Sequence, residues 1–171
     1  MGAVMAVLAL AFAGCATVTP PAGPTPTPPP SSRNGLANAI VVDAISLIGA
    51  PYRWGGESPG GGFDCSGLVQ YVLGQAGIPV PRTSYAQAAA LPVASREDMA
   101  PGDLVFFNTM GQPFSHVGIY IGHRQFVSAL NPRQGVAVQS LDTPYWTARL
   151  DGVRRLPQGQ VLAEAGEGGG P

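Results

Sequence analysis

The sequence predicts an α+β fold, in which helices come first along the chain and an antiparallel sheet follows. Two patterns support this prediction. Apolar residues recur at helical spacing in the first half of the chain, and short apolar segments separated by turn sequences follow in the second half. The chain has 171 residues, and we expect one folded domain over residues 34–156.

Three segments have the spacing and the boundary residues of helices. They are residues 34–48, the residues between Asp64 and Gly77, and residues 84–90. Asp64 is a good N-cap for the second helix, because its carboxylate can accept hydrogen bonds from free backbone N–H groups of the first turn. The first helix is expected to place on one face the apolar residues Leu36, Ile40, Ala44, Leu47 and Ile48.

Short apolar segments in the second half are expected to form the sheet. The turn sequences Pro101-Gly102-Asp103 and Gly122-His123 bound two of them, and we expect His123 to point to solvent from its turn. The sequence TPYWTARL is expected to contain a short helix. The expected strands cover residues 104–107, 116–122, 125–130, 135–141 and 152–156.

The two ends of the chain are expected to lie outside the folded domain. Residues 3–13 are apolar, a run shorter than the roughly 20 residues that span a membrane and typical of a signal peptide. The small residues that end in Cys15 resemble a bacterial lipobox, which predicts a signal peptide over residues 1–14 and a lipidated Cys15. The alternative is that Cys15 is an ordinary small residue at a cleavage site. Residues 15–33 are then a Pro/Thr-rich linker, and residues 157–171 a disordered tail.

Composition excludes several classes of function. The chain has 9 basic and 10 acidic residues and a net charge of -1, which argues against nucleic-acid binding. Its 2 cysteines and 2 histidines stand in unrelated contexts, so neither a disulfide scaffold nor a zinc site is expected. We therefore expect no metal and no cofactor.

Cys65 and His116 are the candidate nucleophile and base. Cys65 stands at the first turn of the second predicted helix, where free backbone N–H groups and the helix dipole favour the thiolate. His116 opens a predicted strand about 50 residues later, and such pairs meet only in the folded protein. The alternatives are a buried structural cysteine and a surface histidine at a strand end.

The segments DCSGLVQYV, PGDLVFF, SHVGIYIG and QFVSA, in this order and spacing, resemble the NlpC/P60 family of papain-like cell-wall cysteine peptidases. The sequences PYRWGG and PYW fit the same family. The resemblance covers nearly all of residues 34–156 and is greatest to short lipoprotein members of Gram-negative bacteria. It implies a papain-like fold, with N-terminal helices packed on a small antiparallel sheet.

The resemblance also implies roles for individual residues. Cys65 is then the nucleophile, and His116 the general base that later protonates the leaving amine. Tyr52 lines the site beside the thiol, and Asp64 and Ser66 hold a free amine of the substrate peptide. For Asp64 the alternative is N-capping alone, and both roles are compatible.

At the third catalytic position the sequence departs from the family pattern. The family usually has His there, sometimes Asn or Gln, to orient the imidazole, and this chain has Ser128. A hydroxyl can accept a hydrogen bond from the ring N–H, directly or through water. Asn131 and Gln139 are alternative partners. We therefore expect an active enzyme that is slower than one with the usual residue.

The resemblance implies hydrolysis of peptidoglycan stem or cross-link peptides, at D-glutamyl–diaminopimelate or diaminopimelate–D-alanine bonds. The expected protein is a monomer on the periplasmic face of the outer membrane, which it contacts only through its lipid anchor. Two alternatives remain open. One is a catalytically weakened lipoprotein that binds murein peptides, and the other is a Cys/His acyltransferase or amidase on the same fold.

Overall fold

The computed structural model describes residues 33–157. The expected signal peptide, Cys15, most of the linker and all but one residue of the tail lie outside these residues. The helices are α1 (Arg33–Ser46), α2 (Cys65–Gln75), α3 (Ser84–Ala90) and α4 (Pro144–Thr147). The strands are β1 (Glu57–Ser58), β2 (Gly62–Phe63), β3 (Val93–Ala94), β4 (Leu104–Phe107), β5 (His116–Gly122), β6 (Gln125–Ala129), β7 (Val136–Ser140) and β8 (Leu150–Arg154).

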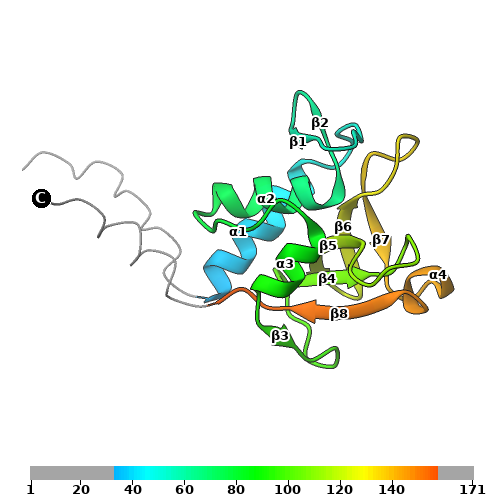
Figure 1. The fold of residues 1–171 in the computed structure, drawn as a ribbon. Coiled ribbons are helices and arrows are strands. Elements are labelled where there is room, and N and C mark those ends of the chain that lie inside the picture. Colours follow the sequence, from blue (N-terminus) through cyan, green and yellow to red (C-terminus); the bar gives the residue numbers. More distant parts are fainter. Residues whose placement is uncertain (1–32, 158–171) are drawn as a thin grey trace, which may run out of the picture.

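The main sheet has six antiparallel strands in the order β3-β8-β4-β5-β6-β7, and β1 and β2 form a separate hairpin (Figure 1). The predicted α+β class is confirmed. The bounds predicted for α3, β4 and β5 agree with the structure. For β4 and β5 the reason is that these short apolar strands are separated by clear turns in the sequence. The very short strands β1 to β3 were not predicted, since two residues carry no readable alternation.

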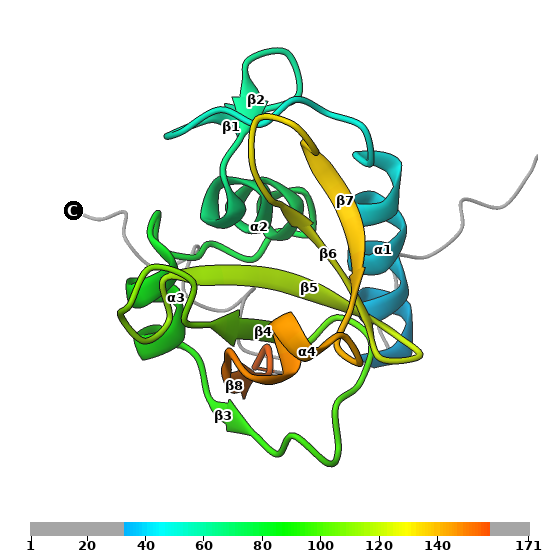
Figure 2. The same cartoon turned by 90° about the vertical axis from the view of Figure 1, so that its right-hand side faces the viewer.

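Apolar side chains of the sheet belong to two clusters. The larger one joins helices α1 and α2 to residues such as Phe106, Val117 and Val127. The smaller one gathers Phe107, Phe126 and Trp146, the last of which comes from α4. Alternate residues of a strand point to opposite faces of a sheet, so Phe106 and Phe107 serve different clusters. Figure 2 shows α2 above β5 and α4 below it.

Helix α1 is shorter than predicted. It ends at Ser46, residues 47–49 form a turn, and Ile48 is exposed rather than part of the core. Ile40 and Ala44 are buried as expected. Among residues 33–157, no helix is both long enough and apolar enough to cross a membrane.

Candidate active site

Helix α2 begins at Cys65 because Asp64 caps it. The Asp64 Oδ1 atom accepts a hydrogen bond from the Gly67 backbone N–H at 2.7 Å, while the backbone of Asp64 is extended. The glycine-rich segment before the helix lies against this first turn. A Cβ atom at Gly67 would lie 2.0 Å from the carbonyl oxygen of Gly56, so only glycine allows this approach. The Gly56 carbonyl also accepts a hydrogen bond from the Asp64 N–H. The loop and the cap therefore fix the position of Cys65.

Cys65 is a half-buried free thiol. Its sulfur accepts a hydrogen bond from the backbone N–H of Val117, the residue that follows His116 on β5. The thiol of α2 thus lies against the start of the strand that carries the candidate base. Burial raises the pKa of the Cys65 thiol, and the negative charge of Asp64 adds to this effect. The Val117 N–H and the first N–H groups of the helix act in the opposite direction.

The helix start thus favours the thiolate as predicted, but it does not decide the net direction of the Cys65 pKa shift. Backbone donors do lower the pKa of Cys65 as expected, but burial outweighs them. The sequence shows the helix end and does not show how much apolar structure surrounds it. With its pKa raised by burial, Cys65 is expected to be a neutral thiol near pH 7.

Ser128 lies directly against the imidazole of His116. The Ser128 Oγ atom is 3.0 Å from His116 Nε2, with no need for a bridging water. The same hydroxyl donates its proton to the Val117 carbonyl oxygen at 2.6 Å. Since a hydroxyl has a single proton, Ser128 can only accept from His116, and Nε2 carries the ring proton. The other ring nitrogen, Nδ1, is left as the atom that can accept a proton.

Aromatic rings enclose His116. The indole of Trp146 stacks on the imidazole, with ring centroids 5.4 Å apart and planes at 27°, and the Phe107 ring centroid lies 6.2 Å away. Burial lowers the pKa of His116 from 6.5 to about 4. The imidazole is therefore neutral near pH 7, which is the form that a general base requires.

The loop before His116 is held in an unusual conformation. Phe114 has φ 59°, which is rare for a bulky residue, and such a strained conformation persists only where surrounding contacts impose it. The Asp151 carboxylate accepts a hydrogen bond from the Phe114 N–H at 2.8 Å. The Phe114 ring packs edge-on against Phe106 and under the guanidinium of Arg154. These contacts set the direction in which the chain enters β5 at His116.

Arg82 is the residue of this site that the sequence analysis missed. Its Nη1 and Nη2 atoms donate to Asp64 Oδ1 and Oδ2 at 2.9 and 2.8 Å, and Nη1 also donates to Ser66 Oγ at 3.1 Å. Although burial acts to raise it, the pKa of Asp64 is lowered because Arg82 and two backbone N–H groups stabilise the carboxylate. Arg82 stands alone in the loop before α3, and no periodic pattern marks it.

The remaining predicted site residues are distributed as follows. Tyr52 lies close enough to the thiol that, after burial, the charge of Cys65 contributes to raising its pKa. Ser66 is buried and donates to Asp64 at 3.2 Å.

The alternative partners of the imidazole lie elsewhere, because Asn131 bonds within its own turn and Gln139 accepts from the Trp146 N–H. His123 is an exposed turn residue, as predicted.

Comparisons with known proteins agree with this architecture. The NlpC/P60 family model matches residues 49–155. Gamma-DL-glutamyl hydrolase of Bacillus subtilis is 42% identical over 119 residues, which are 68% of this chain and 29% of that protein. Murein DD-endopeptidase MepH of Escherichia coli is 43% identical over 123 residues, 69% of this chain and 45% of that protein.

A solved structure from Staphylococcus aureus, described as similar to a lipoprotein of the NLP/P60 family, gives a TM-score of 0.64 at 37% identity. It covers 77% of this chain and 44% of the other chain. The chain thus spans less than half the length of each of these three proteins.

A helix that begins at a cysteine and packs on an antiparallel sheet, one strand of which begins at a histidine, defines the papain-like α+β class. The chain belongs to the NlpC/P60 family, since the family model covers more than half of it and includes the main sheet, α2 and the candidate site.

Proposed function

We propose that this protein is a cysteine peptidase that hydrolyses peptide bonds of peptidoglycan, with Cys65 as nucleophile and His116 as general base. The observation that carries the proposal is the arrangement of thiol and base. The Cys65 sulfur lies against the start of β5, and the Ser128 contact leaves Nδ1 of His116 free to accept a proton. Relatives named as a murein endopeptidase and a glutamyl hydrolase support the substrate class.

The proposed reaction starts from a neutral pair. As the Cys65 sulfur attacks the carbonyl carbon, its proton passes to His116. The carbon–nitrogen bond then breaks, and the imidazolium returns the proton to the leaving amine. Water, deprotonated by the same imidazole, releases the acyl group from sulfur. Ser128 acts by keeping the ring proton on Nε2, so that Nδ1 is the exchanging nitrogen throughout.

Because the thiol is neutral before the attack, the transfer of its proton from Cys65 to His116 is part of the same step in which the sulfur attacks the carbonyl carbon. A thiolate formed before the attack would be stabilised by Val117 N–H and by the helix start, but burial opposes it. Ser128 supports the imidazolium with a neutral acceptor only. We therefore propose a slow enzyme rather than an inactive one.

The scissile bond is one of two within the same peptide network. One named relative is a Gamma-DL-glutamyl hydrolase and the other a DD-endopeptidase. We propose that the bond is either D-glutamyl–diaminopimelate or the diaminopimelate–D-alanine cross-link. Both contain diaminopimelate, so the two cases share the recognition of this residue.

Digestion of purified sacculi tests the proposal. The full chain and its Cys65→Ala variant are incubated with sacculi, and the released peptides are identified by mass spectrometry. We expect new amino termini at one of the two bonds with the wild-type chain and none with Cys65→Ala. Identical products from both would overturn hydrolysis. If the wild-type chain binds the peptides without releasing any fragment, that result would favour the binding lipoprotein.

We also propose that the chain is anchored through a lipid on Cys15, at the periplasmic face of the outer membrane. The support is the sequence alone, an apolar run followed by a small-residue segment that ends in cysteine. Labelling of cells with a fatty-acid analogue should mark the wild-type chain and leave Cys15→Ser unmarked. Equal labelling of both would contradict the anchor.

A further inference from the structure

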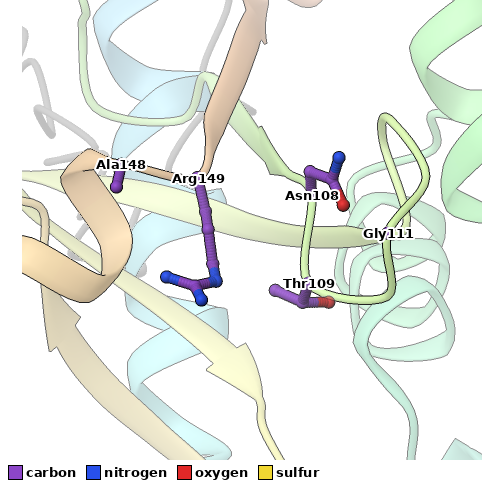
Figure 3. Close-up of a pocket in the computed structure, with 5 residues that line it drawn as sticks. All are labelled: Asn108, Thr109, Gly111, Ala148 and Arg149. Carbon is purple, nitrogen blue, oxygen red and sulfur yellow. The ribbon is translucent and has the colours of Figure 1, made fainter.

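A hollow of about 400 Å³ lies between the loop after β4 and the segment after α4 (Figure 3). Asn108, Thr109 and Gly111 line it from the loop after β4, and Ala148 and Arg149 from the segment after α4. Its two sides are joined where the Asn108 N–H donates to the Arg149 carbonyl oxygen at 2.8 Å. Figure 3 shows the Arg149 side chain extending along one side and Asn108 and Thr109 along the other.

Both sides of this hollow are connected to His116. On one side, the N–H groups of Thr109 and Met110 donate to Ser115 Oγ at 3.0 and 3.1 Å, and Ser115 directly precedes His116. On the other side, Trp146 stacks on the imidazole and belongs to the same short helix that leads to Arg149. The hollow therefore lies between segments that contact Ser115 and the imidazole, whereas α2, which begins at Cys65, lies on the other side of β5 from α4 (Figure 2).

Arg149 is held by contacts with Tyr145 and has no counter-ion among the residues that the structure describes. Its guanidinium lies over the Tyr145 ring, 3.9 Å from the centroid, and Nη1 donates to the Tyr145 carbonyl oxygen at 3.1 Å. None of the ion pairs among residues 33–157 includes Arg149, whereas Arg82 and Arg155 are paired with carboxylates. Four of its five N–H donors are left without a protein acceptor in the part of the chain that the structure describes.

The neighbouring polar groups are also available. In residues 33–157, neither the Asn108 amide nor the Thr109 hydroxyl makes a side-chain hydrogen bond, although both backbone N–H groups are used. The Arg149 guanidinium, with the Asn108 amide and the Thr109 hydroxyl beside it, can bind a carboxylate. Guanidinium and carboxylate fit each other through two parallel hydrogen bonds.

We propose that Arg149, with Asn108 and Thr109, forms a subsite for a free carboxylate of the residue on the leaving side of the scissile bond. The inference rests on the proposed peptidase function. The imidazole protonates the leaving amine, so the leaving residue must lie near His116. The hollow is bordered by the loop that holds Ser115 and by the segment after Trp146, which stacks on the imidazole. Diaminopimelate has two carboxyl groups, and at least one of them stays free in a stem peptide.

Peptide binding to the inactive Cys65→Ala full chain tests the subsite. Two synthetic stem peptides are titrated calorimetrically, one with a free second carboxylate on diaminopimelate and one with that group as an amide. We expect the carboxylate peptide to bind about tenfold more tightly, as a charge-assisted hydrogen-bond pair provides. Arg149→Gln should abolish this preference, and Arg149→Lys should keep only part of it because an ammonium lacks the planar fork.

Arg124→Gln is the matched control, because Arg124 is an exposed arginine in the turn at the other end of β5. It should keep the full preference. Equal binding of both peptides by the parent chain, or an unchanged preference in Arg149→Gln, would overturn the subsite. The two proposals fail separately. Preference without cleavage of sacculi by the wild-type chain would refute hydrolysis alone, and cleavage without preference would refute the subsite alone.

Discussion

The guanidinium of Arg82 and the carboxylate of Asp64 face each other through two hydrogen bonds, of 2.9 and 2.8 Å. Together with Ser66 and the N–H groups of Gly55 and Gly67, five donors surround this carboxylate. An ionised carboxylate offers about four acceptor positions, so Asp64 is saturated. Its predicted role in binding a substrate amine stays a prediction, and such an amine would have to compete with Arg82.

Replacing Arg82 should alter the chemistry of the neighbouring thiol. In Arg82→Gln the charge of Asp64 loses its partner, and that charge already acts to raise the pKa of Cys65. The rate at which iodoacetamide alkylates Cys65 is measured against pH. We expect the midpoint of this curve to lie further above 9.0 in the variant than in the wild-type chain. The pair is partly exposed, so we expect a loss of only about 1–2 kcal/mol in the free energy of unfolding.

The double variant Arg82→Gln/Asp64→Asn is the control for this prediction. Asparagine can still cap α2 but has no charge, so the alkylation profile should return toward that of the wild-type chain. A profile that depends on neither substitution would show that Arg82 has no electrostatic effect on the thiol.

Removing the Ser128 hydroxyl should slow catalysis by about tenfold to a hundredfold. In Ser128→Ala the Nε2 proton of His116 loses its acceptor, and the ring no longer has a fixed tautomer. The decrease should appear in kcat, with a smaller change in KM. Ser128→Thr keeps the hydroxyl and should retain more activity. Nitrogen NMR of His116 measures the tautomer directly, and an unchanged Nε2–H form in Ser128→Ala would contradict this role.

His116 should make the protein less stable in mild acid. Its pKa is about 4 in the folded chain and 6.5 as the ordinary value, so only the unfolded chain binds the proton between these two pH values. Stability is then full above pH 6.5 and falls as the pH decreases toward 4, by about 3 kcal/mol in total. Urea unfolding across this range measures it. His116→Gln should show a flatter dependence, and a wild-type-like slope in this variant would assign the loss to other groups.

Alanine at Gly67 should destabilise the protein and reduce activity. The new Cβ would meet the Gly56 carbonyl oxygen at 2.0 Å, and the loop would have to move away from the start of α2. We expect a loss of about 2–4 kcal/mol in the free energy of unfolding. Gly74→Ala on the same helix is the control, since a Cβ there meets no atom within 4 Å. It should be neutral or stabilising by up to about 1 kcal/mol. Equal effects of both would contradict the close approach at Gly67.

Much of the fold follows from local sequence signals. Asp64 before an apolar stripe predicts the start of α2, and the alternation after His116 predicts β5. Ser128 could be assigned as the partner of His116 only through the family resemblance, because spacing alone also allowed Asn131 and Gln139. The structure separates these alternatives by register, since β6 brings Ser128 next to β5.

The parts that the sequence did not predict depend on tertiary packing. Arg82 reaches Asp64 only because the loop after α2 folds back over the helix start. The direction of the Cys65 pKa shift depends on how deeply the thiol is buried, which no local pattern encodes. The stacking of Trp146 on His116 likewise requires α4 to pack against the far side of the sheet.

The Ser128 hydroxyl donates its proton to the Val117 carbonyl oxygen, so towards His116 it offers only a neutral acceptor. In the proposed reaction the imidazole becomes a cation, and no acidic side chain of residues 33–157 is bonded to it. The compensating negative charge must then come from the sulfur or from the reacting carbonyl oxygen. Charge separation would thus exist only while substrate is being converted. Ionic strength should therefore affect capture of the peptide much more than the bond-breaking step itself.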